Sequence, residues 1–193
     1  KTETRELARK RVAREPLVGR GVITNPPAVV IRGGTIWTSG PQGIVTNAVL
    51  LVENRRITSV TAANSATRIP QSAFELDGTG LHITPGILDA HSHSMILGGV
   101  NEATLPSTAM VRIGDVVNSE TDNLHQQLAG GTTAVNLLHG SANPIGGQSQ
   151  VIKLRDGAGP EELKFGNAPP GIKFALGENV KQSNWGEKNT TRF

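Results

Sequence analysis

The hydrophobic pattern of this 193-residue chain changes at Thr84-Pro85-Gly86, and this change is the strongest constraint on its fold. Before it, short β-type runs are separated by turn residues such as Gly33-Gly34 and Asp77-Gly78. Closely spaced short strands are typical of a small β-sandwich or a partial barrel. After it, strand-like and helix-like segments alternate, which favours parallel strands in an α/β fold. We therefore expect two different architectures on the two sides of this point.

Residues 28–84 are predicted to form the first of these, part of a β-sandwich domain. The expected strands are the apolar runs at 29–31, 35–37, 48–52, 57–60 and 74–76. Glu53-Asn54-Arg55-Arg56 separates two of these runs and predicts a hairpin connection.

Residues 85–193 are predicted to form the second architecture. Strands are expected at 87–93, 132–138, 150–154 and 171–176, with a helix within 107–129 and a helical turn at 161–164. The order strand, helix, strand implies parallel pairing between consecutive strands.

A basic arm, residues 1–27, precedes both, and its first fourteen residues could form a short helix. Residues 1–20 hold seven Lys/Arg against three Asp/Glu, whereas the rest of the chain is close to neutral. Such an arm can bind nucleic acid or an anionic membrane, or it can be solvated or packed on a neighbouring subunit. The body has no basic patch with interleaved aromatic residues, so we expect no nucleic-acid partner.

Two absences narrow the chemistry. The chain has no cysteine, so any metal ion must be held by histidine, carboxylate or a modified side chain. It has no run of about 18 apolar residues, so we expect no transmembrane span. The compartment stays open between the cytoplasm and export after removal of a signal peptide.

The sharpest local motif is Asp89-Ala90-His91-Ser92-His93 at the end of an apolar strand. Alternate side chains of a strand project from the same face, so the two imidazoles can converge on one ion. Neutral imidazole is a good ligand for zinc and neighbouring divalent metals. Asp89 lies on the same face and could orient one of the ligands. The alternative is that the two histidines face solvent and bind no metal.

In its context this motif resembles the amidohydrolase superfamily, nearest to the imidazolonepropionase-like and metal-dependent dipeptidase branch. The resemblance rests on Thr84-Pro85-Gly86-Ile87-Leu88-Asp89-Ala90-His91-Ser92-His93, on the Val-Ile-Arg-Gly-Gly-Thr-Ile strand pair upstream, and on Gly130-Gly131-Thr132-Thr133-Ala134 downstream. It covers about residues 28–181. It implies an α/β fold with a small β-sandwich domain and the first half of a (β/α)₈ TIM-type barrel. It also implies that His91 and His93 bind a catalytic divalent ion, with zinc expected.

Lys173 is the second candidate at the metal centre. Burial inside a barrel would disfavour its ammonium form and leave a nucleophilic amine. In relatives with two metals, a lysine in a similar strand is carboxylated and its carbamate bridges both ions. The resemblance therefore implies a catalytic and metal-binding role for Lys173. The alternatives are a lysine that points outward or a neutral partner in a one-metal site, and Lys181 is a weaker rival.

The loop after the second strand supplies the candidate substrate contacts. Loops that follow the strands build the active face of a (β/α)₈ barrel. His139, Asn143 and Gln148 could contact substrate there, or the loop could simply turn. His82 and His125 are expected to be structural or exposed.

The resemblance implies hydrolysis of a C–N bond in an amide, cyclic amide or peptide-like substrate by a metal-activated water. The rival interpretation is a non-catalytic relative that keeps the fold as an interaction scaffold. A full barrel needs about 250 residues, and the relatives take two further histidine ligands and an aspartate from later strands. We therefore expect a complementary chain or C-terminal segment as a partner, besides the substrate and further copies in a homo-oligomer.

Overall fold

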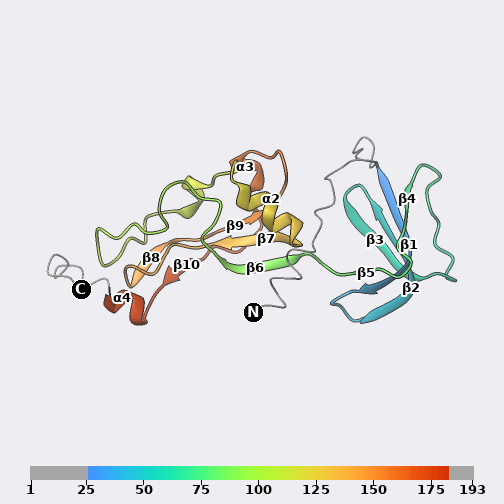
Figure 1. Cartoon of the computed structure of the whole chain (residues 1–193), viewed down its shortest axis with the longest axis horizontal. Helices are drawn as coiled ribbons and strands as arrows, with labels where there is room; N and C mark the ends of the chain where they lie inside the picture. Colours follow the sequence, from blue (N-terminus) through green and yellow to red (C-terminus); the bar gives the residue numbers. More distant parts are fainter. Residues whose placement is uncertain (1–25, 183–193) are drawn as a thin grey trace, which may run out of the picture. The chain divides into compact units, whose positions relative to one another are not determined.

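A computed structural model describes residues 26–182, and these fall into two compact units that divide between Pro85 and Gly86 (Figure 1). Residues 1–25 of the basic arm, which include the expected helix over residues 1–14, lie outside the described residues. Within residues 26–182, no helix is long and apolar enough to cross a lipid bilayer. The structure as a whole consists of mixed β-sheets with few helices.

The first unit is one five-stranded sheet. Its strands are β1 (Ala28–Trp37), β2 (Ile44–Glu53), β3 (Arg56–Ala62), β4 (Phe74–Asp77) and β5 (His82–Ile83). The order is β3-β2-β1-β4, and β5 pairs with the distal part of β1. The two pairings β1–β2 and β2–β3 are antiparallel, whereas β4 and β5 run parallel to β1.

Two local predictions for this sheet have different outcomes. The hairpin between β2 and β3 is confirmed, with Asn54 and Arg55 both at positive φ (49° and 65°), as a two-residue turn requires. The two strands expected at 29–31 and 35–37 are instead one strand, β1. Gly33 adopts a φ of 79° at a register shift, so the glycine pair forms an irregularity within the strand instead of ending it.

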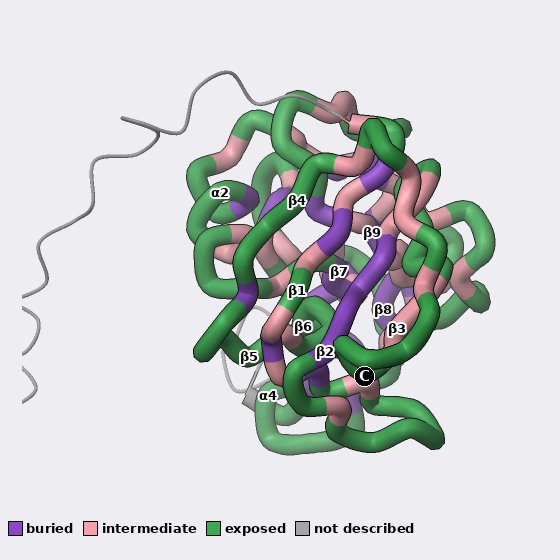
Figure 2. Tube along the Cα trace, turned by 90° about the vertical axis from the view of Figure 1, so that its right-hand side faces the viewer, coloured by how far each residue is buried: buried purple, intermediate pink, exposed green. Residues whose placement is uncertain are grey.

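Both faces of the sheet are partly covered, although the described strands of this unit form a single sheet and not two stacked ones. One face carries the cluster Val30, Val49 and Leu51, and the other carries Ile36, Ala48 and Leu50. Figure 2 shows that the buried residues follow β1 and β2, whereas β4 is exposed.

The second unit holds the motif. Its elements are β6 (Ile87–Ser92), the 3₁₀ helix η1 (Ile113–Val116), α2 (Asp122–Ala129), β7 (Thr132–Leu137), β8 (Ile145–Gln148), β9 (Gln150–Lys153), α3 (Pro160–Leu163), β10 (Ile172–Phe174) and α4 (Glu178–Gln182). β6 and β7 pair in parallel across α2, as their order predicts.

The later strands do not follow the parallel prediction. β9 pairs antiparallel with β7, and β10 pairs antiparallel with β8 in a separate two-stranded sheet. The chain between β7 and β9 contains β8 and loop residues but no helix, so it lacks the helical crossover that usually joins parallel strands. The helix expected within 107–129 is also shorter, because only α2 is α-helical and the preceding residues form loops and η1.

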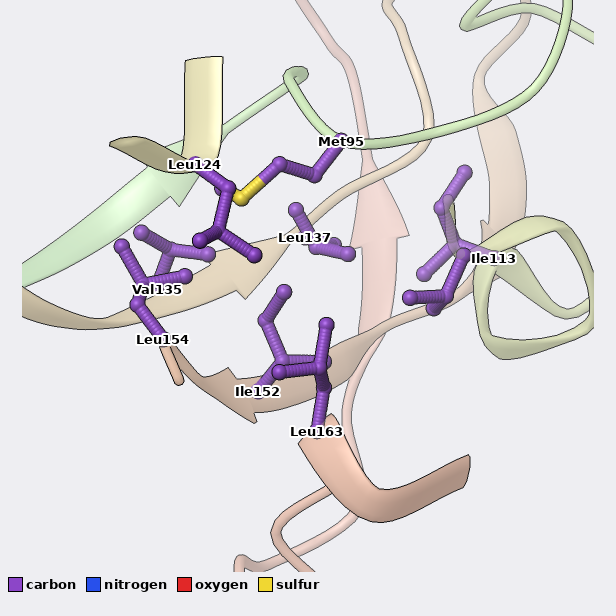
Figure 3. Close-up of a cluster of buried hydrophobic side chains, with 9 residues drawn as sticks. Met95, Ile113, Leu124, Val135, Leu137, Ile152, Leu154 and Leu163 are labelled. Carbon is purple, nitrogen blue, oxygen red and sulfur yellow. The ribbon is translucent and has the colours of Figure 1, made fainter. Parts of the chain in front are cut away.

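One apolar cluster packs the helices and the long loop after β6 against one face of the sheet β6-β7-β9 (Figure 3). Its buried members are Met95, Ile113, Val117, Leu124, Val135, Leu137, Ile152, Leu154 and Leu163. Full burial of one such side chain contributes about 1.5–3 kcal/mol. Through Met95, two residues after His93, the cluster holds the chain that leaves the histidine motif.

Candidate metal centre

The two motif histidines converge at the end of β6. His91 Nε2 and His93 Nε2 are 3.0 Å apart, and the rings meet edge to face with an interplanar angle of 84°. In a tetrahedral zinc site with bonds of about 2.05 Å, two ligand nitrogens lie about 3.3 Å apart. A shift of a few tenths of an ångström would therefore let both nitrogens bind one ion.

The contact of His93 with β7 fixes the form of its imidazole. His93 Nδ1 lies 2.8 Å from the Leu138 carbonyl oxygen, which can only accept a hydrogen bond. Nδ1 therefore carries the hydrogen, and the Nε2 lone pair points towards His91. Two lone pairs cannot face each other at 3.0 Å, so a proton or a cation must lie between the two rings. This donor arrangement fits a divalent metal ion.

Lys173 joins the pair from β10. Its Nζ atom lies 3.4 Å from His91 Nε2, and a cavity of about 260 Å³ adjoins it, lined in part by Ser141, Phe174 and Val180. Lys181, the weaker rival, lies on α4 instead.

The electrostatics keep His91 in the neutral form that a metal needs. Partial desolvation of the ring lowers the pKa of His91 from its ordinary 6.5, and the positive charge of Lys173 and the nearness of His93 lower it further. The Asp89 carboxylate acts in the opposite direction but does not overcome them. Protons therefore compete less well for His91 than for an ordinary histidine.

Asp89 has a different contact from the expected one. Its Oδ1 accepts a hydrogen bond from the His91 backbone N–H at 3.1 Å. Asp89 thus supports the backbone at the strand end, and the ring of His93 is oriented by a main-chain carbonyl.

The three residues expected to contact substrate lie in the loop after β7 and in β8. His139 and Asn143 are 1% and 0% exposed, and their side chains bind loop groups around Glu102. Both side chains are therefore engaged with groups of the two loops. Gln148 is exposed and donates to the Ala109 carbonyl at 3.0 Å.

The remaining histidines behave as expected. His82 is exposed and accepts a hydrogen bond from the Trp37 indole at 2.9 Å, and His125 is exposed on α2 beside Asp156. Within residues 26–182, no third His, Cys, Asp or Glu joins His91 and His93 in a metal-binding cluster.

Sequence reasoning missed the long loop between β6 and η1 as a partner of the site. Its Val100, Asn101 and Glu102 contact the loop after β7. The glycines at 140, 146 and 147 are a sequence signal of this close packing, because a Cβ at any of them would meet neighbouring atoms.

The sequence and the structure were compared with those of known proteins. No family model matches the chain. It is 31% identical over 183 residues to the amidohydrolase tasK of Hapsidospora irregularis, covering 79% of this chain and 19% of that protein. It is 31% identical over 81 residues to an imidazolonepropionase of Streptomyces coelicolor, covering 42% of this chain and 20% of that enzyme.

Among solved structures, an amidohydrolase from Thermotoga maritima matches with a TM-score of 0.69 and 33% identity, over 80% of this chain and 40% of the other. The chain thus spans about a fifth of the curated relatives it matches. The chain belongs to the amidohydrolase superfamily and resembles the N-terminal part of its imidazolonepropionase-like members.

Proposed function

We propose that the protein is a metal-dependent hydrolase of C–N bonds, acting on an amide, cyclic amide or peptide-like substrate. The observation that carries this proposal is the convergence of His91 Nε2, His93 Nε2 and Lys173 Nζ from two strands that are far apart in sequence. The relatives named amidohydrolase and imidazolonepropionase support the same class of reaction.

His91 and His93 would hold the ion, and zinc suits their imidazole nitrogens. When bound, such an ion lowers the pKa of a water molecule and polarises a carbonyl group. The chain's own contribution is to present two lone pairs at one point. The Leu138 carbonyl orients His93, and the lowered pKa of His91 keeps the second ring neutral.

Lys173 would be the bridging ligand of a two-metal site. The neutral amine attacks the carbon of carbon dioxide, an N–C bond forms, one C=O electron pair moves to oxygen, and a proton leaves to solvent. The product replaces a positive charge with an anionic group that has two oxygen donors. An unmodified ammonium beside a cation would be repelled.

We further propose that residues 1–27 form an arm, residues 28–84 contribute to a β-sandwich domain, and residues 85–193 form the first part of a (β/α)₈ barrel. Exposed apolar residues on the two strands at the site support this. Ile87 and Leu88 on β6 are 57% and 73% exposed, and Ile172 and Phe174 on β10 are also exposed. Further strands would cover them and supply the remaining ligands and a carboxylate for proton transfer.

Metal analysis of the complete protein tests the proposal. The variant with both His91→Ala and His93→Ala should lose most of its zinc, whereas His125→Ala, which removes an exposed histidine elsewhere, should retain it. The wild-type protein, reloaded with zinc, should hydrolyse members of a panel of N-acyl amino acids, dipeptides and cyclic amides. Wild-type zinc content in the double variant would refute the site, and bound zinc without turnover would favour a scaffold.

A further inference from the structure

We propose that His139 is a positioning residue of the metal centre: its buried imidazole anchors the Leu138 carbonyl that orients His93. This inference rests on the proposed function, because it concerns the ligand His93. It gives the residue a role that differs from substrate binding.

The Leu138 peptide is the direct partner of the ligand. Its carbonyl oxygen lies 2.8 Å from His93 Nδ1, and its N–H donates to the Ser92 carbonyl at 3.0 Å. A metal ligand of this type depends on the group bound to its other ring nitrogen, which fixes both the tautomer and the ring direction. Movement of the Leu138 carbonyl would therefore turn His93 Nε2 away from His91.

His139 follows Leu138 directly, and both of its ring nitrogens are occupied. Nδ1 lies 2.9 Å from the Gly140 carbonyl oxygen, which accepts, so Nδ1 carries the hydrogen. Nε2 lies 2.9 Å from the Glu102 backbone nitrogen, whose N–H points to it, and 3.1 Å from the Glu102 carbonyl oxygen. The ring thus joins the loop after β7 to the loop after β6, and the residue is only 1% exposed.

Further hydrogen bonds join the two loops. Asn143, fully buried, donates to Thr108 Oγ1 at 2.8 Å and to the Leu105 carbonyl at 3.0 Å. The Gly140 N–H donates to the Val100 carbonyl at 2.7 Å. These bonds hold the residues that follow His139 against the loop after β6, and breaking them would leave buried polar groups of Asn143 and Thr108 unpaired.

Close packing around the ring adds a steric constraint. A Cβ at Gly146 would lie 2.7 Å from His139 Nδ1, and a Cβ at Gly147 would lie 2.6 Å from the Val111 carbonyl oxygen. These two glycines of β8 thus allow the strand to pass close to His139 and Val111. Such packing fixes the His139 ring. His139 is joined by one peptide bond to Leu138, whose carbonyl oxygen contacts His93.

The test compares zinc affinity and folding in the complete protein. His139→Leu fills the same space but cannot accept from Glu102 or donate to Gly140. His139→Asn keeps a donor for Gly140 and loses the acceptor for Glu102. His125→Leu is the matched control, because that histidine is exposed on α2. Zinc affinity is measured by competition with a chelator, the cobalt-substituted site by its visible spectrum, and folding by thermal unfolding of the metal-free proteins.

We expect zinc affinity to fall about 10–100-fold in His139→Leu and less in His139→Asn, with a changed cobalt spectrum in both. A residue that only supports the loop would lower thermal stability and leave the affinity and spectrum of the folded protein unchanged. Unchanged zinc affinity and cobalt spectrum in whichever variant folds would overturn the inference. Zinc retained after His91→Ala with His93→Ala would instead refute the proposed function itself.

Discussion

The Lys173 Nζ atom lies 3.4 Å from His91 Nε2, although the two residues are 82 positions apart in the chain. An amine here adds positive charge beside an imidazole whose pKa is already lowered by desolvation. In a metal-free protein the ammonium can donate to the neutral ring, but it would be repelled by a bound cation, whereas a lysine converted to an anion would favour one. Substitution of Lys173 can therefore show whether this lysine is a metal ligand or has only a structural role.

Lys173→Ala should lower metal affinity and activity together. Loss of a direct ligand should cost at least as much as loss of an outer partner, which lowers affinity about 10–100-fold. Acetate or propionate should restore part of the activity, because either can supply the missing carboxylate. Lys181→Ala on α4 is the control and should have no effect. Wild-type metal content in Lys173→Ala, without rescue, would indicate a one-metal site that does not use this residue.

The lowered pKa of His91 predicts how the metal-free protein responds to acid. The folded protein binds this proton less tightly than the unfolded chain, so stability is complete above about pH 6.5 and falls as the pH is lowered below that value. The fall in thermal midpoint between about pH 7.5 and about pH 5.5 should be smaller in His91→Gln than in wild type. Lys173→Met should act in the same direction, because it removes one of the charges that lower the pKa. An unchanged fall in both variants would contradict the assignment.

The sequence was most informative where the structure depends on local geometry. Convergence of His91 and His93 follows from the period of two along a strand, and the β2–β3 hairpin follows from a two-residue connection. The parallel pair β6–β7 follows from the helix between its strands. Each of these depends on residues that are close in the chain.

Pairing between distant strands, and the burial of loop residues, could not be predicted from the sequence in the same way. The antiparallel partners of β9 and β10 depend on which strand edges are available, and no local pattern encodes this. His139 follows a strand, like a substrate-binding residue, but the loop around Glu102 buries it. The stretch 107–129, within which a helix was predicted, contains two separate elements: Val116 lies in η1, and Leu124 and Leu128 lie in α2.

Leu163→Ala should be strongly destabilising, because this side chain is fully buried in the cluster that packs against the β6-β7-β9 sheet. Truncation of a buried leucine costs about 2–5 kcal/mol. Leu81→Ala, at a leucine that is 58% exposed, should change stability by about 0.5 kcal/mol or less. Urea unfolding followed by circular dichroism measures both, and equal effects would show that the cluster does not stabilise the unit.

Gly86→Ala should destabilise the connection into β6. A Cβ at Gly86 would lie 2.7 Å from Thr133 Cβ, which is part of the stiff, branched stem of that side chain and cannot rotate away. The Ile87 N–H donates to the Gly131 carbonyl at 2.9 Å, so the backbone beside Gly86 is held close to β7 and cannot easily withdraw. Relief of the clash requires a backbone shift, which typically costs about 1–3 kcal/mol.

The matched control for this last prediction is Gly99→Ala, because a Cβ at Gly99 would meet no atom within 4 Å. It should leave the unfolding midpoint in urea close to that of wild type. Since β6 carries His91, Gly86→Ala should also weaken zinc binding, whereas Gly99→Ala should not. Thr133→Ser in the Gly86→Ala background should recover part of the lost stability, because it removes one branch of the obstructing side chain. Full wild-type stability in Gly86→Ala would show that the β6–β7 contact can open at this point at little cost.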